Sequence, residues 1–166
     1  MPRFTSRQIA TAGLIAALYA ALTIFLPVPQ YGAVQCRIAE AMTVLPFLFP
    51  ESILGLSIGC FAANLLSPFP LDCVFGTAAT LLAALWTSRV KREIFAPMPP
   101  VICNAVIIGA EIAWFAAQDG EQFLRAFAFN AFTVGLGEAI ACYGFGMLLL
   151  RALEHFPRLK EAVRRV

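Results

Sequence analysis

Long apolar runs follow one another along the chain from Ile9 to Leu150, and prolines and short polar segments separate them. This pattern predicts six helical spans. The expected ranges are 8–26, 37–49, 51–66, 72–88, 99–117 and 123–153. The first range has about 19 residues, and at ~1.5 Å per residue a helix of that length crosses a bilayer core.

The second expected span is short and contains Pro46. About 13 helical residues cover roughly two-thirds of a ~30 Å hydrocarbon core, so neighbouring helices must shield the ends of this span. In many transporters such short or broken helices line the substrate site. The sequence therefore places the second span next to a site for a solute.

The composition is typical of a membrane protein. The 166-residue chain is 60% hydrophobic and 13% charged, with a mean hydropathy of +0.80, whereas soluble domains are about 25% charged. We interpret residues 1–166 as one integral membrane domain.

The basic residues predict the orientation. With the N-terminus inside, ten of the twelve Lys and Arg residues fall in inner segments, and Arg37 and Arg125 are the exceptions. Cytoplasmic segments of membrane proteins carry the excess of Lys and Arg. We therefore expect an all-α, multi-pass protein of the cytoplasmic membrane, built as a six-helix transmembrane bundle with cytoplasmic N- and C-termini.

Four acidic residues lie within these apolar runs or at their ends: Glu40, Asp72, Glu111 and Glu138. A charged side chain at membrane depth normally faces the protein interior or a water-filled cavity. Glu111 and Glu138 lie away from helix ends, so a functional role is the first hypothesis, and a buried carboxyl bonded to another helix is the alternative. Together the four acids predict a polar pocket.

The other polar candidates have simpler explanations beside the functional one. Arg37 and Glu40 are three residues apart and share a helix face, so they could form a local ion pair or reach a pocket. Asp72 could cap the N-terminus of its helix or contact a ligand. Asn64 is a weaker candidate, since amides between helices often serve only packing.

Small residues recur every four positions in the first span, at Ala12, Ala16 and Ala20, and the third span contains Gly55 and Gly59. Such stripes let helix backbones approach closely. They indicate either packing within this chain or a docking surface for another membrane subunit, and composition does not decide between the two.

Several kinds of chemistry lack the residues they need. The chain has no G-x-x-x-x-G-K-[ST] motif for binding ATP, one histidine, and no nucleophile–base set, so we expect neither an enzyme nor a nucleic-acid-binding protein. The five cysteines lack metal-ligand spacing, and we expect no metal and no cofactor. A disulfide between Cys36 and Cys73 is conceivable.

Four stretches, in order, resemble the queuosine-precursor transporter family. Members of this family are membrane-embedded substrate-binding (S) components of energy-coupling factor transporters. They are QCRIAEAMTVLPF (35–47), GCFAANLLSPF (59–69), DCVFGTAATLLAAL (72–85) and VGLGEAI (134–140). The resemblance implies an S-component-like fold and uptake of a 7-deazaguanine, such as 7-cyano- or 7-aminomethyl-7-deazaguanine. It also implies a transmembrane coupling subunit and two cytoplasmic ATPase subunits as partners, with the alanine stripe of the first span as the docking surface.

The chemistry of the candidates is compatible with such a substrate. Carboxylates accept the N–H groups of a guanine-like edge as charge-assisted hydrogen bonds. Arg37 could donate to the ring carbonyl, and Phe47, Phe69 or Phe75 could stack on the ring, a contact of about 1–3 kcal/mol in nucleobase sites.

Three other functions are compatible with the sequence. The chain could be a self-sufficient, proton-coupled carrier of a small solute, with Glu111 or Glu138 as the proton site. It could also be an S component for another vitamin. Lastly, it could be a structural or assembly protein of the membrane that binds no small molecule.

Overall fold

The computed structural model describes residues 5–26, 31 and 35–156, and every regular element in that part of the chain is a helix. The elements in order are α1 (Ser6–Phe25), η1 (Ile38–Phe47), α2 (Ser52–Asn64), α3 (Asp72–Thr87), η2 (Glu93–Phe95), α4 (Met98–Ala116), α5 (Gly120–Ala139), η3 (Ile140–Gly146) and α6 (Met147–His155). The segments η1 and η2 are 3₁₀-helices, and η3 is a π-helix.

Each range that the sequence predicted to be helical is helical here, with ends that differ by three residues or fewer. The elements α5, η3 and α6 follow one another without a break and form one helix of 36 residues. In the described part of the chain, three helices are long and apolar enough to cross a membrane: Ser6–Phe25, Glu93–Ala116 and Gly120–His155. The elements η1, α2 and α3 are shorter apolar helices. The chain is therefore a helical membrane protein with several candidate spans.

The second helix differs from the expectation of a short α-helix kinked at Pro46. It is a 3₁₀-helix of 10 residues, although 3₁₀ runs longer than about four residues are uncommon. A 3₁₀-helix rises ~2.0 Å per residue, so these residues span about 20 Å rather than the ~15 Å of an α-helix. Residues 39–46 are all buried, which confirms that neighbouring elements shield this helix.

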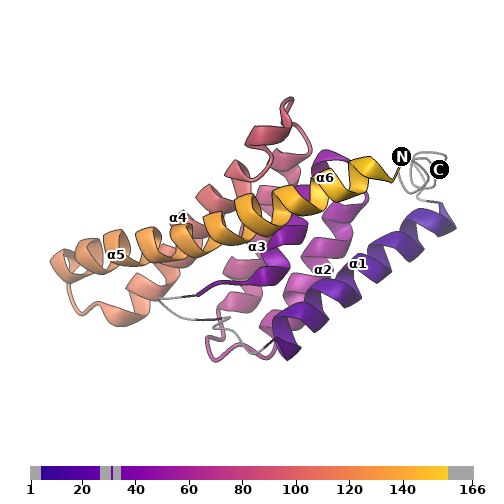
Figure 1. Cartoon of the computed structure of the whole chain (residues 1–166). Helices are drawn as coiled ribbons and strands as arrows, with labels where there is room; N and C mark the ends of the chain where they lie inside the picture. Colours follow the sequence, from indigo (N-terminus) through magenta and orange to yellow (C-terminus); the bar gives the residue numbers. More distant parts are fainter. Residues whose placement is uncertain (1–4, 27–30, 32–34, 157–166) are drawn as a thin grey trace.

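Consecutive helices are neighbours, so α1 packs on α2, α2 on α3, α3 on α4, and α4 on α5. Figure 1 shows that α1 begins and α6 ends at the same end of the bundle. The turns from α2 to α3 and from α4 to α5 lie toward the opposite end. The 3₁₀-helix η1 contacts α1, α2, α3, α4, α6 and η3, so it lies at the centre of the bundle.

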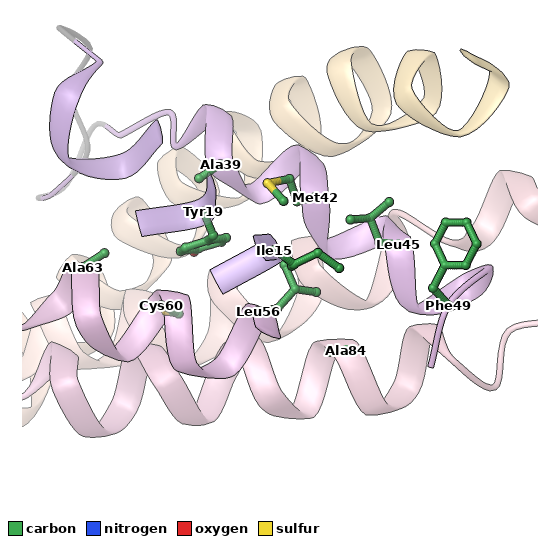
Figure 2. Packing of buried hydrophobic residues seen from close by; sticks show 10 residues of the cluster. All are labelled: Ile15, Tyr19, Ala39, Met42, Leu45, Phe49, Leu56, Cys60, Ala63 and Ala84. Carbon is green, nitrogen blue, oxygen red and sulfur yellow. The ribbon is translucent and has the colours of Figure 1, made fainter. Parts of the chain in front are cut away.

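The main apolar cluster surrounds η1. Figure 2 shows Ile15 and Tyr19 of α1 between Met42 of η1 and Leu56 of α2. Because lipid tails are as apolar as leucine, van der Waals packing rather than the hydrophobic effect holds such contacts together in a membrane.

The α1–α2 contact depends on glycine. A Cβ atom added at Gly55 would lie 2.5 Å from the carbonyl oxygen of Ala12, and one added at Gly59 would lie 2.7 Å from that of Ala16. Small residues allow this close approach of two backbones. Two alanines of the predicted stripe therefore pack within this chain, against α2.

We expect Gly55→Ala to destabilise the protein, because the new methyl group would overlap a backbone atom that has no room to move. Overpacking of this kind costs about 1–3 kcal/mol. The matched control is Gly13→Ala, since a Cβ at Gly13 meets nothing within 4 Å. Thermal unfolding of both purified variants tests this, and equal midpoints would contradict it.

Candidate functional site

Arg37 lies at the centre of the buried polar groups. Arg37 is 5% exposed, and it is the only buried basic residue in the part of the chain that the structure describes. Its Nη2 atom lies 3.5 Å from Oδ2 of Asp72, and its guanidinium lies over the ring of Tyr31, 4.7 Å from the centroid. The Tyr31 hydroxyl donates to the carbonyl of Ala63 at 2.9 Å. The start of η1 is thus tied to the end of α2 and the start of α3.

The structure corrects the interpretation of Asp72 as a helix cap. The cap residue of α3 is Leu71, without a side-chain cap bond. The Asp72 carboxylate instead accepts from the Ser67 hydroxyl and pairs with Arg37. Asn64 donates from Nδ2 to the Asp72 carbonyl at 2.9 Å, so it links α2 to α3 next to the ion pair.

Glu40 is held from two sides. The Tyr19 hydroxyl of α1 donates to Glu40 Oε1. The Glu40 carbonyl accepts from Thr43 Oγ1 at 2.6 Å and from Cys142 Sγ at 3.3 Å. The other carboxylate oxygen, Oε2, is buried without a hydrogen bond of normal geometry. Arg37 lies near this side chain.

Glu138 lies on α5, directly before the π-helix, and is 3% exposed. Cys142 Sγ donates to its Oε2 at 3.7 Å. Asn104 of α4, also buried, lies near both Glu138 and Glu40. A side chain at Gly137 would overlap the carbonyl oxygen of Gln35, so this glycine allows α5 to approach the segment that carries Arg37.

Glu111 of α4 is the carboxylate of this cluster that faces a cavity. It is 6% exposed, and neither of its oxygens has a hydrogen bond of normal geometry. Asp72 and Arg37 lie nearby. It lines a cavity of about 610 Å³ between α3, α4 and the start of α5. That volume falls within the range of ~300–1,000 Å³ for small-molecule sites.

Aromatic rings form much of the cavity wall: Phe75, Trp114, Phe115 and Phe123. The Phe69 ring lies 6.4 Å from that of Phe115, measured between centroids, and extends this aromatic edge. A single acid among aromatic and aliphatic walls suits a flat ring that carries N–H donors along one edge. The cavity thus offers both stacking and charge-assisted hydrogen bonding.

Most of the predicted site residues come together, on five elements or their ends. Arg37, Glu40, Asp72, Glu111 and Glu138 are all buried and lie in one cluster, and Asn64 adjoins Asp72.

Phe47 is not part of this cluster. It lies at the far end of η1 and packs on Val44, Ala96 and Leu150. Nine residues of a 3₁₀-helix separate it from the start of η1 by ~18 Å.

The predicted docking residues and cysteines also have definite places. Ala12 is buried, whereas Ala16 and Ala20 are half-buried. Cys36 and Cys73 are free thiols, so the conceivable disulfide is not formed.

Tyr19 and Asn104 are the main residues of the cluster that sequence reasoning did not place there. Asn104 lies in an apolar run, where an amide often serves only packing between helices. Tyr19 lies in an apolar span, where an aromatic residue is normally part of the core. Its hydroxyl was the available clue, because a buried tyrosine usually finds a hydrogen-bond partner.

A helical membrane protein with buried carboxylates around one arginine and an aromatic cavity beside them belongs to the class of solute-handling membrane proteins. Comparison with known sequences narrows this class. The chain belongs to the QueT transporter family, whose sequence profile matches residues 9–155. This is a family of transporters.

One curated relative is the queuosine precursor transporter QueT of Lactococcus lactis subsp. cremoris (strain MG1363). It is 32% identical over 101 residues, which cover 57% of this chain and 60% of that protein. The chain therefore spans about three-fifths of the length of this relative. No solved structure gives a significant match. These findings confirm the family resemblance seen in the four sequence stretches.

We expect Arg37→Met to destabilise the protein strongly, because it leaves buried carboxylates without their cation. Breaking a buried ion pair from one side costs about 3–5 kcal/mol. The matched control is Arg125→Met, which breaks an exposed pair with Glu121 whose side chains are 79% and 76% exposed; such surface pairs contribute about 0–1 kcal/mol. Similar losses of thermal stability in the two variants would contradict a central role for Arg37.

Proposed function

We propose that this chain is the substrate-capture subunit for uptake of a queuosine precursor, a 7-deazaguanine, across the cytoplasmic membrane. Membership of the QueT transporter family supports the solute class. The single structural observation that carries the proposal is Glu111, a buried carboxylate without a normal hydrogen bond that lines an aromatic cavity. The relative from Lactococcus lactis is named for queuosine precursors, and we extend that solute to this chain.

The proposed binding mode follows from the shape and chemistry of the cavity. The flat deazaguanine ring stacks against aromatic walls such as Phe75 and Phe115. Glu111 accepts N–H groups from the guanine-like edge. Stacking of a base on an aromatic side chain contributes about 1–3 kcal/mol.

The acid that lines the cavity favours the aminomethyl compound over the nitrile. Glu111 borders the cavity, and neither of its oxygens has a hydrogen bond of normal geometry. An opposite charge within about 4–6 Å stabilises a carboxylate. A protonated aminomethyl group supplies such a charge, whereas a nitrile supplies none. We therefore propose 7-aminomethyl-7-deazaguanine as the better ligand.

We further propose that residues 1–166 form one membrane domain that crosses the bilayer six times, with both termini in the cytoplasm. The shared end of α1 and α6 and the opposite position of the α2–α3 and α4–α5 turns support this (Figure 1). The basic residues of the α3–α4 connection, Arg89, Lys91 and Arg92, agree with an inner position.

The proposed partners are a transmembrane coupling subunit and two cytoplasmic ATPase subunits, as the family resemblance implies. The sequence lacks a P-loop, so energy from ATP must come from another chain. Ala12, Ala16 and Ala20 remain the proposed docking stripe. Because Ala12 and Ala16 contact α2, we extend the docking surface to the exposed neighbours Gly13 and Ala17.

Titration of the purified protein tests the proposed solute. We expect saturable binding of 7-deazaguanines, tightest for the aminomethyl compound, and no binding of riboflavin or thiamine. Glu111→Gln should weaken binding by about tenfold, since a hydrogen bond to a charged group contributes about 1.5–3 kcal/mol. Glu121→Gln, on an exposed surface, should leave the affinity unchanged. Tight vitamin binding without a response to any 7-deazaguanine would overturn the proposal.

A proton-coupled carrier is the second candidate function, and the burial of Glu138 and Glu40 near Asn104 is the observation that favours it. Uptake in cells separates the two functions. The capture subunit should give no sustained accumulation without its ATPase partners, and accumulation with them should survive collapse of the proton gradient. Accumulation by this chain alone that stops when the gradient collapses would instead establish the carrier.

A further inference from the structure

A cavity of about 550 Å³ lies between η2, in the α3–α4 connection, and the long helix formed by α5, η3 and α6. The lining residues of the long helix recur every four positions, so they share one face of it: 143, 144, 147, 148 and 151. This cavity has no lining residue in common with the one that Glu111 borders. It is therefore a separate site from the one proposed for the solute.

Two side chains of opposite charge border this cavity, Glu93 of η2 and Arg151 of α6. Neither forms an ion pair with another residue in the described part of the chain. Glu93 is half-buried, and its Oε1 atom is buried without a hydrogen-bond partner among the described residues. The cavity thus presents one negative and one positive group, and each is able to take a partner that enters from the cavity.

The rest of the cavity wall is mainly apolar. Ile94, Tyr143 and Leu148 are all exposed on the surface of the described structure, where acyl chains surround a helix that lies in a membrane. Gly144 deepens the cavity, because a Cβ atom added there would meet nothing within 4 Å. The charged part of the cavity is therefore continuous with an apolar surface.

The neighbouring charges place this cavity at the level of the lipid headgroups. Arg89, Lys91 and Arg92 come shortly before Glu93 and are exposed, and Arg151 lies near the end of the long helix. Charged side chains are costly in the hydrocarbon core, so η2 and the end of α6 belong at the boundary between membrane and water. From there the cavity wall continues toward the acyl chains.

We propose that this cavity binds a zwitterionic phospholipid whose headgroup carries a primary ammonium, such as phosphatidylethanolamine. The Arg151 guanidinium donates N–H groups to the phosphate, for which its geometry is well suited. The Glu93 carboxylate accepts from the ammonium, which has three N–H donors. A choline headgroup has no N–H to donate, so it does not provide the hydrogen bond that Glu93 lacks. The apolar wall contacts the acyl chains.

Native mass spectrometry of the full chain, titrated with lipids, tests the proposal. The probes are phosphatidylethanolamine and phosphatidylcholine with identical acyl chains. Both are zwitterionic, so the basic residues before Glu93 attract them equally and a difference in affinity reports the N–H donors. We expect phosphatidylethanolamine to bind about tenfold more tightly, as for a hydrogen bond to a charged acceptor.

Two variants assign the headgroup contacts. Glu93→Gln should reduce the preference for phosphatidylethanolamine to about threefold or less, because hydrogen bonds to a neutral acceptor are roughly half as strong. Arg151→Met should weaken both lipids alike, since the phosphate is common to them. The matched controls are Glu121→Gln and Arg125→Met, which change an exposed ion pair elsewhere and should leave both affinities unchanged.

A third variant tests the cavity without changing a charge. Gly144→Leu should fill the cavity and weaken both lipids by about tenfold or more. Its matched control is Gly13→Leu on α1, where an added Cβ also meets nothing within 4 Å. This comparison decides the question even where Glu93→Gln does not fold.

Equal affinity for the two lipids would overturn the proposal, and it is the result expected if a protein partner covers the cavity instead. A preference that survives Glu93→Gln, or full binding by Gly144→Leu, would also overturn it. Glycerophosphoethanolamine, the same headgroup without acyl chains, should not displace the lipid at equal concentration, and displacement would indicate a soluble ligand rather than a lipid. These outcomes leave the proposed uptake of 7-deazaguanines untouched, because the titration with those compounds tests it separately.

Discussion

The buried guanidinium of Arg37 is the interaction on which the arrangement of this protein depends. Isolated carboxylates at membrane depth are expensive, and they persist where an opposite charge or a polar cavity stabilises them. Arg37 supplies that charge directly to Asp72 of α3, whose Oδ2 lies 3.5 Å away. Glu40 of η1, Glu111 of α4 and Glu138 of α5 lie in the same buried cluster. Four helices therefore contribute an acid to one polar centre of the bundle.

Two helices of unusual geometry lie beside the buried cluster around Arg37. The 3₁₀-helix η1 and the π-helix η3 pack against each other, and their backbones approach so closely that a Cβ at Gly146 would lie 3.1 Å from the carbonyl oxygen of Ala41. The narrow 3₁₀-helix lets η1 fit inside the bundle with Arg37 and Glu40 at its N-terminal end. Single π-helical turns within long helices are frequently found at functional sites, and η3 begins two residues after Glu138.

Much of this arrangement could be predicted from the sequence, because prolines and apolar runs are local properties. They predicted the ends of the helices to within three residues. The acidic residues within the apolar runs indicated the polar cluster. The failures concern properties that are not local. Asp72 looks like a cap because its partner, Arg37, is 35 positions away in the sequence. Phe47 packs with Val44, Ala96 and Leu150, and the last two are distant from it in the sequence. Tyr19 resembles a core residue until its distant acceptor is known.

The same buried charges connect stability with binding. Acceptors without normal hydrogen bonds, such as Glu40 Oε2 and the Glu111 oxygens, raise the free energy of the unliganded protein, because buried polar groups are costly when they are unpaired. A ligand rich in N–H donors removes that cost, so part of its binding free energy comes from relief of the protein's own unpaired acceptors. Anything that binds only the folded state also stabilises it by mass action. A buried acceptor without a donor therefore favours a donor-rich ligand over one that offers only acceptors.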